Sequence, residues 1–269
     1  MSALPTREVA KPWGREQLPA PFNAARPEKT GEIWFEPPPE LDQLLVKYIF
    51  TSEALSVQVH PSDAQTEAKG LGRQGKEECW LVLEADPGAT LGIGFRQALD
   101  APTMRAAALD GSIEQLLTWH PVSRGDFFYI PANTVHAIGA GISLIEVQQN
   151  SDITYRLYDY GRPRELHLDE GMAVAKGEVF PPSLHYRLAE RGNAQLVDGP
   201  YFRLDRIEGH PEVATQAHYA IGPLLVLPLE GEVLVGGEVI APGGCALAER
   251  LDKIEFAPGG LSLITQPIT

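Results

Sequence analysis

Two histidines, a glutamine and a glutamate in this 269-residue chain have the residue types and spacing of metal ligands. Gln58 and His60 lie two residues apart in LSVQVHP, Glu78 follows in GKEECW, and His136 lies in IPANTVHAIG. A set of nitrogen and oxygen ligands of this kind suits zinc or another first-row divalent cation. The chemistry to expect is that of a Lewis acid that polarises the oxygen atoms of a bound substrate.

The segment from Leu55 to Pro61 has the alternating pattern of a β-strand. Successive side chains of a strand point to opposite faces, so its polar and aliphatic residues should separate. The polar face would hold Ser56, Gln58 and His60, and the other face Leu55, Val57 and Val59. A polar face that points inward indicates a working site rather than ordinary core.

Each of these residues also has an ordinary structural interpretation. Gln58 and His60 taken singly are often hydrogen-bonded strand residues, and His136 could be a core histidine. Glu78 would be a costly buried charge unless it is paired, for example with Lys76 two residues earlier. Arg156 could simply join an ion-pair cluster around Asp159.

Composition excludes some classes of partner. The net charge of −14 argues against nucleic acid and anionic membranes, and an anionic substrate would need local positive charge in the site. With no long apolar run and no signal-peptide layout at the start, we expect a cytoplasmic protein. Cys79 and Cys245 are too few for a disulfide framework and are expected to be buried thiols.

The pattern along the chain is mostly that of short strands. Residues 1–30 should form an extended arm, and a small helical insert is expected at about residues 97–119. Pro181-Pro182 marks a boundary between residues 1–180 and 181–269. The second part, with glycine turns such as Gly236-Gly237, is typical of a sandwich or small barrel and carries no metal-like set.

Four motifs in the right order resemble those of one enzyme family. LSVQVHP, GKEECW, GDFFYIPANTVHAIG and ISLIEVQQNSDITYRLYDYGR are similar to the type I phosphomannose isomerases, or mannose-6-phosphate isomerases, in their short bacterial form. The similarity covers about residues 8–165. It implies an all-β fold: a cupin jelly roll with a small helical insert, followed by a second, degenerate cupin-like β domain without a metal site.

The resemblance also assigns roles to individual residues. It implies one zinc ion per chain, or another divalent metal, bound by Gln58, His60, Glu78 and His136. The catalytic residues it implies are Arg156, Glu146 and Lys76, and the substrate-binding ones Ser56 and Lys11. The large helical insert of longer members is mostly missing from this chain.

The function implied is the interconversion of mannose 6-phosphate and fructose 6-phosphate through an enediol. The partner would be a small sugar phosphate, with no nucleic acid or membrane, and the chain would be a monomer or homodimer. Two alternatives are a cupin oxygenase with non-haem iron and a cupin that binds sugar phosphate without turnover. Gln58 as a fourth ligand argues against the first, and Glu146, Lys76 and Arg156 argue against the second.

Overall fold

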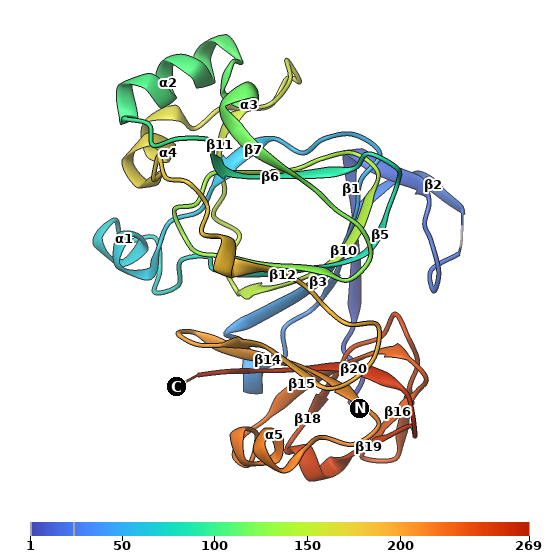
Figure 1. Cartoon of the computed structure of the whole chain (residues 1–269). Coiled ribbons are helices and arrows are strands. Elements are labelled where there is room, and N and C mark those ends of the chain that lie inside the picture. The colour runs from blue at the N-terminus through green and yellow to red at the C-terminus, as the bar shows by residue number, and fades with distance from the viewer. Residues whose placement is uncertain (1, 24, 269) are drawn as a thin grey trace.

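The computed structural model describes residues 2–23 and 25–268 and is built mainly from antiparallel strands. Layers of sheet stack between two ends of the molecule (Figure 1). Helices α2, α3 and α4 lie at one end, two large sheets follow, and a second β domain lies at the other end. No helix in these ranges is long and apolar enough to cross a bilayer.

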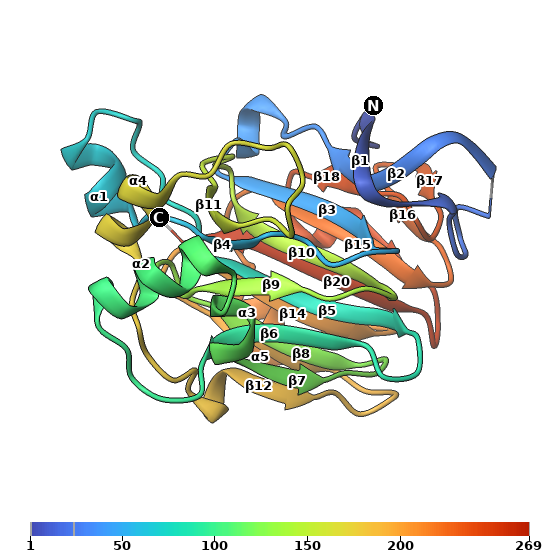
Figure 2. The ribbon, with the colours of Figure 1, turned by 90° about the horizontal axis from the view of Figure 1, so that it is seen from above.

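Two antiparallel sheets face each other in the first domain, as expected for a jelly roll. The seven-stranded sheet runs β1 (Thr6–Gln17), β2 (Ala25–Phe35), β3 (Leu44–Phe50), β10 (Ile142–Gln149), β5 (Glu78–Ala85), β8 (Asp126–Ile130) and β12 (His185–Arg187). The five-stranded sheet runs β11 (Tyr155–Tyr158), β4 (Val57–Val59), β9 (His136–Ile138), β6 (Thr90–Phe95) and β7 (Leu117–Pro121), and is seen from the helix side in Figure 2. The extended arm is the hairpin of β1 and β2.

Helices cover the outer face of the five-stranded sheet. They are α2 (Ala101–Asp110), α3 (Ile113–Leu116) and α4 (Leu168–Val174), and α1 (Asp63–Ala68) lies in the connection after β4. Asp100 caps α2 by accepting from the Thr103 amide at 2.8 Å, and Gly111 ends it at a φ of 83°. The helical insert expected at residues 97–119 is thus present but shorter, because the chain returns to the sheet as β7.

The second domain is a smaller sandwich. Its five-stranded sheet runs β13 (Ala194–Asp198), β14 (Phe202–Glu208), β20 (Leu261–Pro267), β15 (Leu224–Glu230) and β18 (Ala246–Ala248). Its three-stranded sheet runs β17 (Glu238–Ile240), β16 (Val233–Val235) and β19 (Ile254–Phe256), and α5 (Val213–His218) flanks the domain. Gly236 and Gly237 join β16 to β17 with φ of 59° and 86°, as a two-residue hairpin turn requires. Across both domains, the described residues also form three short 3₁₀ helices: η1 (Pro39–Leu41), η2 (Pro182–Leu184) and η3 (Leu251–Lys253).

A continuous apolar layer joins the two domains. Side chains such as Phe127 of the seven-stranded sheet pack with Phe202 and Leu263 of the second domain. Cys79 and Cys245 are buried in the same layer as free thiols, which confirms that expectation. The division at residue 180 stays a prediction, and β12, which follows it, still pairs with β8.

Candidate metal centre and active-site pocket

The predicted ligands come from both sheets of the first domain and point into the space between them. Gln58 on β4 pairs across the strands with His136 on β9, and His60 follows β4 directly. Glu78 is the first residue of β5 in the facing sheet. The fold therefore brings together side chains that are up to 78 residues apart in the sequence.

The alternation predicted around β4 is correct for five residues and wrong for one. Val57 and Val59 pack toward the helices, while Gln58 and His60 face the other sheet. Leu55, however, packs with Trp13 between the two sheets and lines the same pocket as Ser56. The reason is that regular pairing covers only Val57–Val59, so the two-residue period does not extend back to Leu55.

Three of the four predicted ligands form a compact, buried triangle. Ligand atoms of His60, Glu78 and His136 all lie within 4.8 Å of one another. His136 Nε2 is 3.3 Å from Glu78 Oε1, and His60 Nε2 is 3.8 Å from Glu78 Oε2. Each of the three side chains is at most 2% exposed, so water does not supply hydrogen bonds to these polar groups.

Both histidines present the same ring nitrogen to the triangle. His60 Nδ1 is 2.8 Å from the carbonyl oxygen of Ile153, and His136 Nδ1 is 2.9 Å from that of Thr134. A carbonyl only accepts, so Nδ1 carries the proton and the Nε2 lone pair is left for a cation. Burial lowers the pKa of both rings, that of His136 to about 4, and so favours the neutral, metal-binding form.

Gln58 completes the set from the pocket side. Its Nε2 lies 3.3 Å from His136 Nε2, and Ser56 Oγ donates to its Oε1 at 3.3 Å. Because the Ser56 hydroxyl accepts as well as donates, the amide can turn its oxygen toward the triangle and keep this hydrogen bond. An amide oxygen in that place is a suitable fourth ligand.

Glu78 is the strongest sign that a cation fits this site. Its two oxygens are fully buried, and within the described residues neither accepts a hydrogen bond of good geometry, although Lys76 Nζ lies 2.8 Å from Oε2. Burial and the nearby Glu146 raise the pKa of Glu78 above its ordinary value, against the effect of Lys76. A buried carboxylate with free lone pairs beside two Nε2 atoms matches the needs of a divalent metal.

A pocket of about 320 Å³ opens beside the triangle. The sequence-predicted residues that line it are Lys11, Ser56, Gln58, Lys76, Glu146 and Arg156. His60, Glu78 and His136 lie buried next to it, linked through Gln58 and Lys76. A volume of this size is in the range of small-molecule sites.

Glu146 on β10 is held at the wall of this pocket as a carboxylate. Lys47 Nζ lies 2.9 Å from its Oε1, the Trp80 indole donates to its Oε2 at 2.9 Å, and Lys76 Nζ is 3.7 Å away. Although burial opposes ionisation, the ammonium groups of Lys47 and Lys76 lower the pKa of Glu146 to about 2. Glu146 and Glu78 in turn raise the pKa of Lys76 above its ordinary value despite its burial.

Lys47 is a pocket residue that the sequence analysis missed. It lies in the otherwise apolar strand LLVKYIF, where a single cation among buried side chains was the available signal. Its ammonium group also lies 4.6 Å from the centre of the Trp34 ring and 4.0 Å from Glu32 Oε2. Glu32 on β2 also pairs with Lys11 on β1 at 3.2 Å, so the contact between Glu32 and Lys47 links the β1–β2 hairpin to β3 at the pocket.

Arg156 lines the pocket without joining the ion-pair cluster considered for it. Asp159 instead pairs with Arg164 through two bonds of 2.6 Å and with Arg162 at 3.3 Å. Arg156 Nη1 donates to the Glu165 carbonyl at 2.7 Å, and its buried Nε has no hydrogen-bond partner among the described residues. Within the part of the chain that the structure describes, no carboxylate in contact neutralises its charge.

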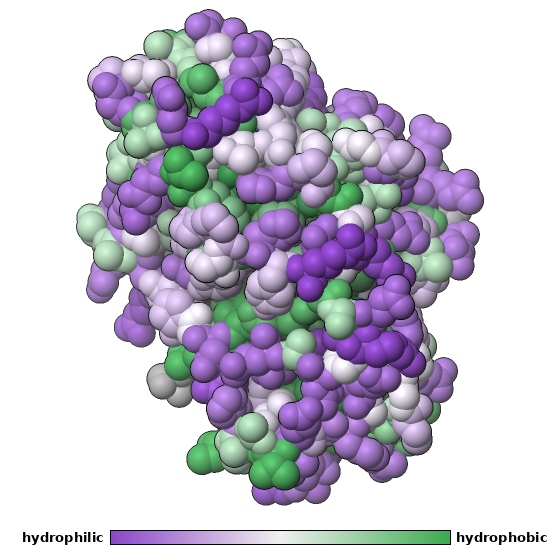
Figure 3. Space-filling model, viewed as in Figure 1, coloured by the Kyte–Doolittle hydropathy of each residue, from purple (hydrophilic) through white to green (hydrophobic). Residues whose placement is uncertain are grey.

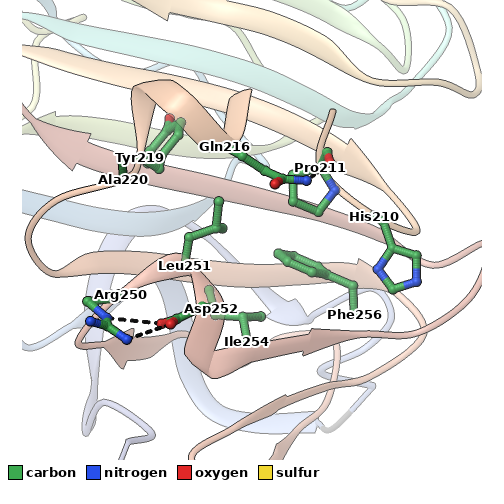
Figure 4. Close-up of a pocket in the computed structure, with 10 residues that line it drawn as sticks. All are labelled: His210, Pro211, Gln216, Tyr219, Ala220, Arg250, Leu251, Asp252, Ile254 and Phe256. Atoms are coloured by element: carbon green, nitrogen blue, oxygen red, sulfur yellow. Dashed lines mark hydrogen bonds and ion pairs between the residues drawn. The ribbon is translucent and has the colours of Figure 1, made fainter. Parts of the chain in front are cut away.

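The second domain has a pocket of its own with different chemistry. Leu251 and Phe256 lie between His210 on one side and the Arg250–Asp252 ion pair on the other (Figure 4). Within residues 2–23 and 25–268, the triangle in the first domain is the group of histidine, cysteine and carboxylate side chains close enough to hold a metal. The group that could hold a metal therefore lies in the first domain.

The chain is similar in sequence to known mannose-6-phosphate isomerases. No family model matches the chain. It is 37% identical to the mannose-6-phosphate isomerase of Streptococcus mutans over 210 residues and 35% identical to that of Bacillus subtilis over 211 residues. Each match covers 74% of this chain and 65% of the relative, so it spans just under two thirds of these proteins.

Solved structures show the same fold. A crystal structure of the Bacillus subtilis mannose 6-phosphate isomerase has a TM-score of 0.78 at 23% identity and covers 99% of this chain and all of that one. A variant of phosphomannose isomerase from Salmonella typhimurium has a TM-score of 0.73 at 16% identity over the whole of both chains.

The fold and site thus define an all-β, cupin-type protein with a buried site suited to a divalent metal, which confirms the predicted fold class. By its sequence the chain is a homologue of the mannose-6-phosphate isomerases, and the resemblance in its motifs is confirmed.

Proposed function

We propose that this chain is a metal-dependent aldose–ketose isomerase that interconverts mannose 6-phosphate and fructose 6-phosphate. The observation that carries the proposal is the buried triangle of His60, Glu78 and His136 beside a pocket lined by Lys76 and Glu146. The names of the homologous proteins support the choice of substrate.

The proposed metal site consists of His60, Glu78, His136 and Gln58. A zinc ion, or another divalent cation, would act there as a Lewis acid that polarises substrate oxygens. The proposal includes one ion per chain, because the described residues hold one such group.

The remaining pocket residues would handle protons and charge. The reaction takes a proton from one of two neighbouring carbons and returns it to the other, and negative charge develops on an oxygen in between. Glu146 is an ionised carboxylate that can accept a proton or hold a substrate hydroxyl. Lys76, 3.7 Å from Glu146 and 2.8 Å from Glu78, supplies a fixed positive charge for the developing oxyanion.

We assign Arg156 to the negative charge that develops on the substrate. Among the described residues no carboxylate contacts its guanidinium, so this positive charge is available to face an oxyanion in a protein whose net charge is −14. We assign Arg156 mainly to the enediol oxyanion, and Ser56 and Lys11 to substrate binding at the same pocket. A cytoplasmic location and a monomer or homodimer remain predictions.

The alternatives differ in a measurable way. A binding-only cupin would take up mannose 6-phosphate without converting it, and an iron oxygenase would consume oxygen. Lys76 and Lys47 are buried around Glu146 beside the pocket. Such fixed positive charges favour the isomerase, because they can stabilise an anionic intermediate and an iron centre that activates oxygen does not require them.

A coupled assay tests the proposal. Mannose 6-phosphate is offered to the zinc-loaded protein, and fructose 6-phosphate is detected with an enzyme that uses only the ketose. We expect turnover that a chelator abolishes and added zinc restores. Binding of the sugar phosphate without turnover, under conditions where a known isomerase is active, would disprove the enzymatic proposal.

A further inference from the structure

Gln148 is a buried polar residue near the metal centre to which the proposed mechanism gives no role. Hydrophilic side chains cover much of the face shown in Figure 3, whereas Gln148 is fully buried. Burying an amide is costly unless its polar groups form hydrogen bonds. The hydrogen bonds of Gln148 therefore indicate what this side chain does.

Gln148 lies beside the predicted ligand Glu78. The two residues form a cross-strand pair between β10 and β5, and the side chains of such a pair point to the same face of the sheet. Val147 packs toward the second domain, so its neighbours Glu146 and Gln148 face the space between the two sheets of the first domain. The side chain of Gln148 is thus in the same layer as the metal triangle.

Two acceptors fix the direction of the Gln148 amide. Its Nε2 donates to the carbonyl oxygen of Gln149 at 2.7 Å and to that of Ser151 at 2.8 Å. Because a carbonyl oxygen only accepts, the NH₂ group must face both of them. Its Oε1 is buried without a hydrogen-bond donor among the described residues. An apolar side chain would avoid this cost, so the two donated bonds are what distinguishes glutamine here.

Both bonds belong to the turn of residues 149–153, which connects β10 to β11. The first part of this turn is also held by other segments. The backbone amide of Gln149 donates to the Glu77 carbonyl at 3.0 Å, and that of Asn150 donates to the Gln43 carbonyl at 2.8 Å. This part should keep its conformation without Gln148.

The second part of the turn depends more on Gln148. The Ser151 carbonyl accepts from Gln148, and the Ile153 amide donates to Ser151 Oγ at the long distance of 3.5 Å. The Ile153 carbonyl then accepts from Nδ1 of His60 at 2.8 Å. Lys76 contacts the same ring only at Nε2, which is the atom that a metal would take. The Ile153 carbonyl is therefore the contact that can orient His60 with a metal bound.

We propose that Gln148 is a positioning residue of the metal centre: it holds the turn so that the Ile153 carbonyl keeps Nε2 of His60 directed at the metal. This inference rests on the metal site of the proposed function. Groups that hydrogen-bond to a ligating histidine fix its orientation, and their loss typically lowers metal affinity about 10- to 100-fold. Because Gln148 acts through Ile153, we expect the lower end of this range, about tenfold.

The zinc affinity of Gln148→Met tests the proposal. Methionine is unbranched like glutamine and has no N–H group, so it removes both donated bonds and still fills the space. The full-length, zinc-loaded chain is titrated with a chelator of known zinc affinity. We expect zinc to bind the variant about tenfold more weakly than the unaltered chain. If Gln148→Met does not fold, Gln148→Asn, whose amide has a shorter reach, should show a loss in the same direction.

Gln266→Met is the matched control. Gln266 on β20 is 7% exposed, and its Nε2 also donates to two carbonyl oxygens, that of Ile221 at 2.7 Å and that of Pro223 at 3.0 Å. Its replacement removes the same kind of bonds in the second domain, so it should lower stability in a similar way. Zinc affinity should stay unchanged, because the triangle lies in the first domain.

Proton exchange at His60 is a second readout, and it needs no metal. In the metal-free chain the Nδ1–H of His60 is buried and bonded to the Ile153 carbonyl, so NMR should show slow exchange with water. Exchange should be faster in the Gln148 variant and unchanged in Gln266→Met.

Three results would overturn the inference: unchanged zinc affinity in the folded Gln148 variant, an equal loss of affinity in Gln266→Met, or unchanged proton exchange at His60 in the Gln148 variant. None of these measurements uses turnover. A chain that binds zinc but does not convert mannose 6-phosphate would therefore disprove the proposed activity alone, whereas an unaltered chain without affinity for zinc would overturn both.

Discussion

Replacing Lys47 by methionine should destabilise the first domain strongly, because it removes the partner of a buried carboxylate. The side chains of Lys47 and Glu146 are 7% and 4% exposed, and their charged atoms are 2.9 Å apart. Breaking a buried pair from one side typically costs about 3–5 kcal/mol, since the remaining charge stays buried. Lys76, 3.7 Å from Glu146, offsets part of this, so we expect a loss of roughly 2–3 kcal/mol.

A double-mutant cycle separates the pair from the packing of the methionine. If Glu146→Gln is added to Lys47→Met, no buried charge is left without its partner, and the second change should recover part of the loss. We expect a coupling energy of at least about 1 kcal/mol. Lys29→Met is the matched control: its ion pair with Glu53 spans 3.1 Å but is exposed, so its loss should cost less than about 1 kcal/mol.

Urea denaturation followed by tryptophan fluorescence is a suitable assay for this cycle. The chain's four tryptophans, Trp13, Trp34, Trp80 and Trp119, all lie in the first domain, so the signal reports its unfolding. The metal-free protein should be used, so that metal binding does not add to stability. A loss below about 1 kcal/mol for Lys47→Met, or purely additive effects in the cycle, would refute the reasoning.

Three further predictions concern the metal, the substrate and the second domain. His136→Ala should abolish zinc binding measured by elemental analysis while circular dichroism keeps the β signal, whereas His120→Ala, outside the triangle, should retain zinc. Arg156→Ala should lower kcat by about 10²–10³ and change KM little in steady-state kinetics; a raised KM with kcat unchanged would assign Arg156 to phosphate binding in both states. Burial raises the pKa of the Asp205 carboxyl group. Its contribution to the free energy of unfolding is therefore complete below the unfolded-state pKa and is lost as the pH rises through the folded-state pKa. In urea denaturation, Asp205→Asn should reduce this loss of stability with rising pH.

Much of the site could be predicted because its signals are local. Gln58 and His60 at a spacing of two residues on a polar strand face indicated a shared direction, and the structure has them facing the opposite sheet. The error at Leu55 has a local cause as well, since the strand begins only at Val57. Alternation predicts faces only where regular pairing holds the backbone extended.

The parts that were missed depend on distant segments. Lys47 and Glu146 are 99 residues apart, and nothing near Lys47 shows which carboxylate β10 brings to it. Strands β12 to β14, between residues 185 and 208, also had no clear alternation, because charged residues such as Arg203 and Arg206 lie within them. Arg206 is nevertheless buried, since backbone carbonyls of residues 189–192 satisfy its guanidinium.

Titration of metal-free protein with zinc, while conversion of mannose 6-phosphate is followed by NMR, tests the central claim most directly. If the buried triangle is the catalytic metal site, the rate should rise linearly with added zinc and level off at one equivalent per chain, and His136→Ala should stay inactive throughout. A rate that is independent of zinc, or no fructose 6-phosphate at any zinc concentration, would contradict the account.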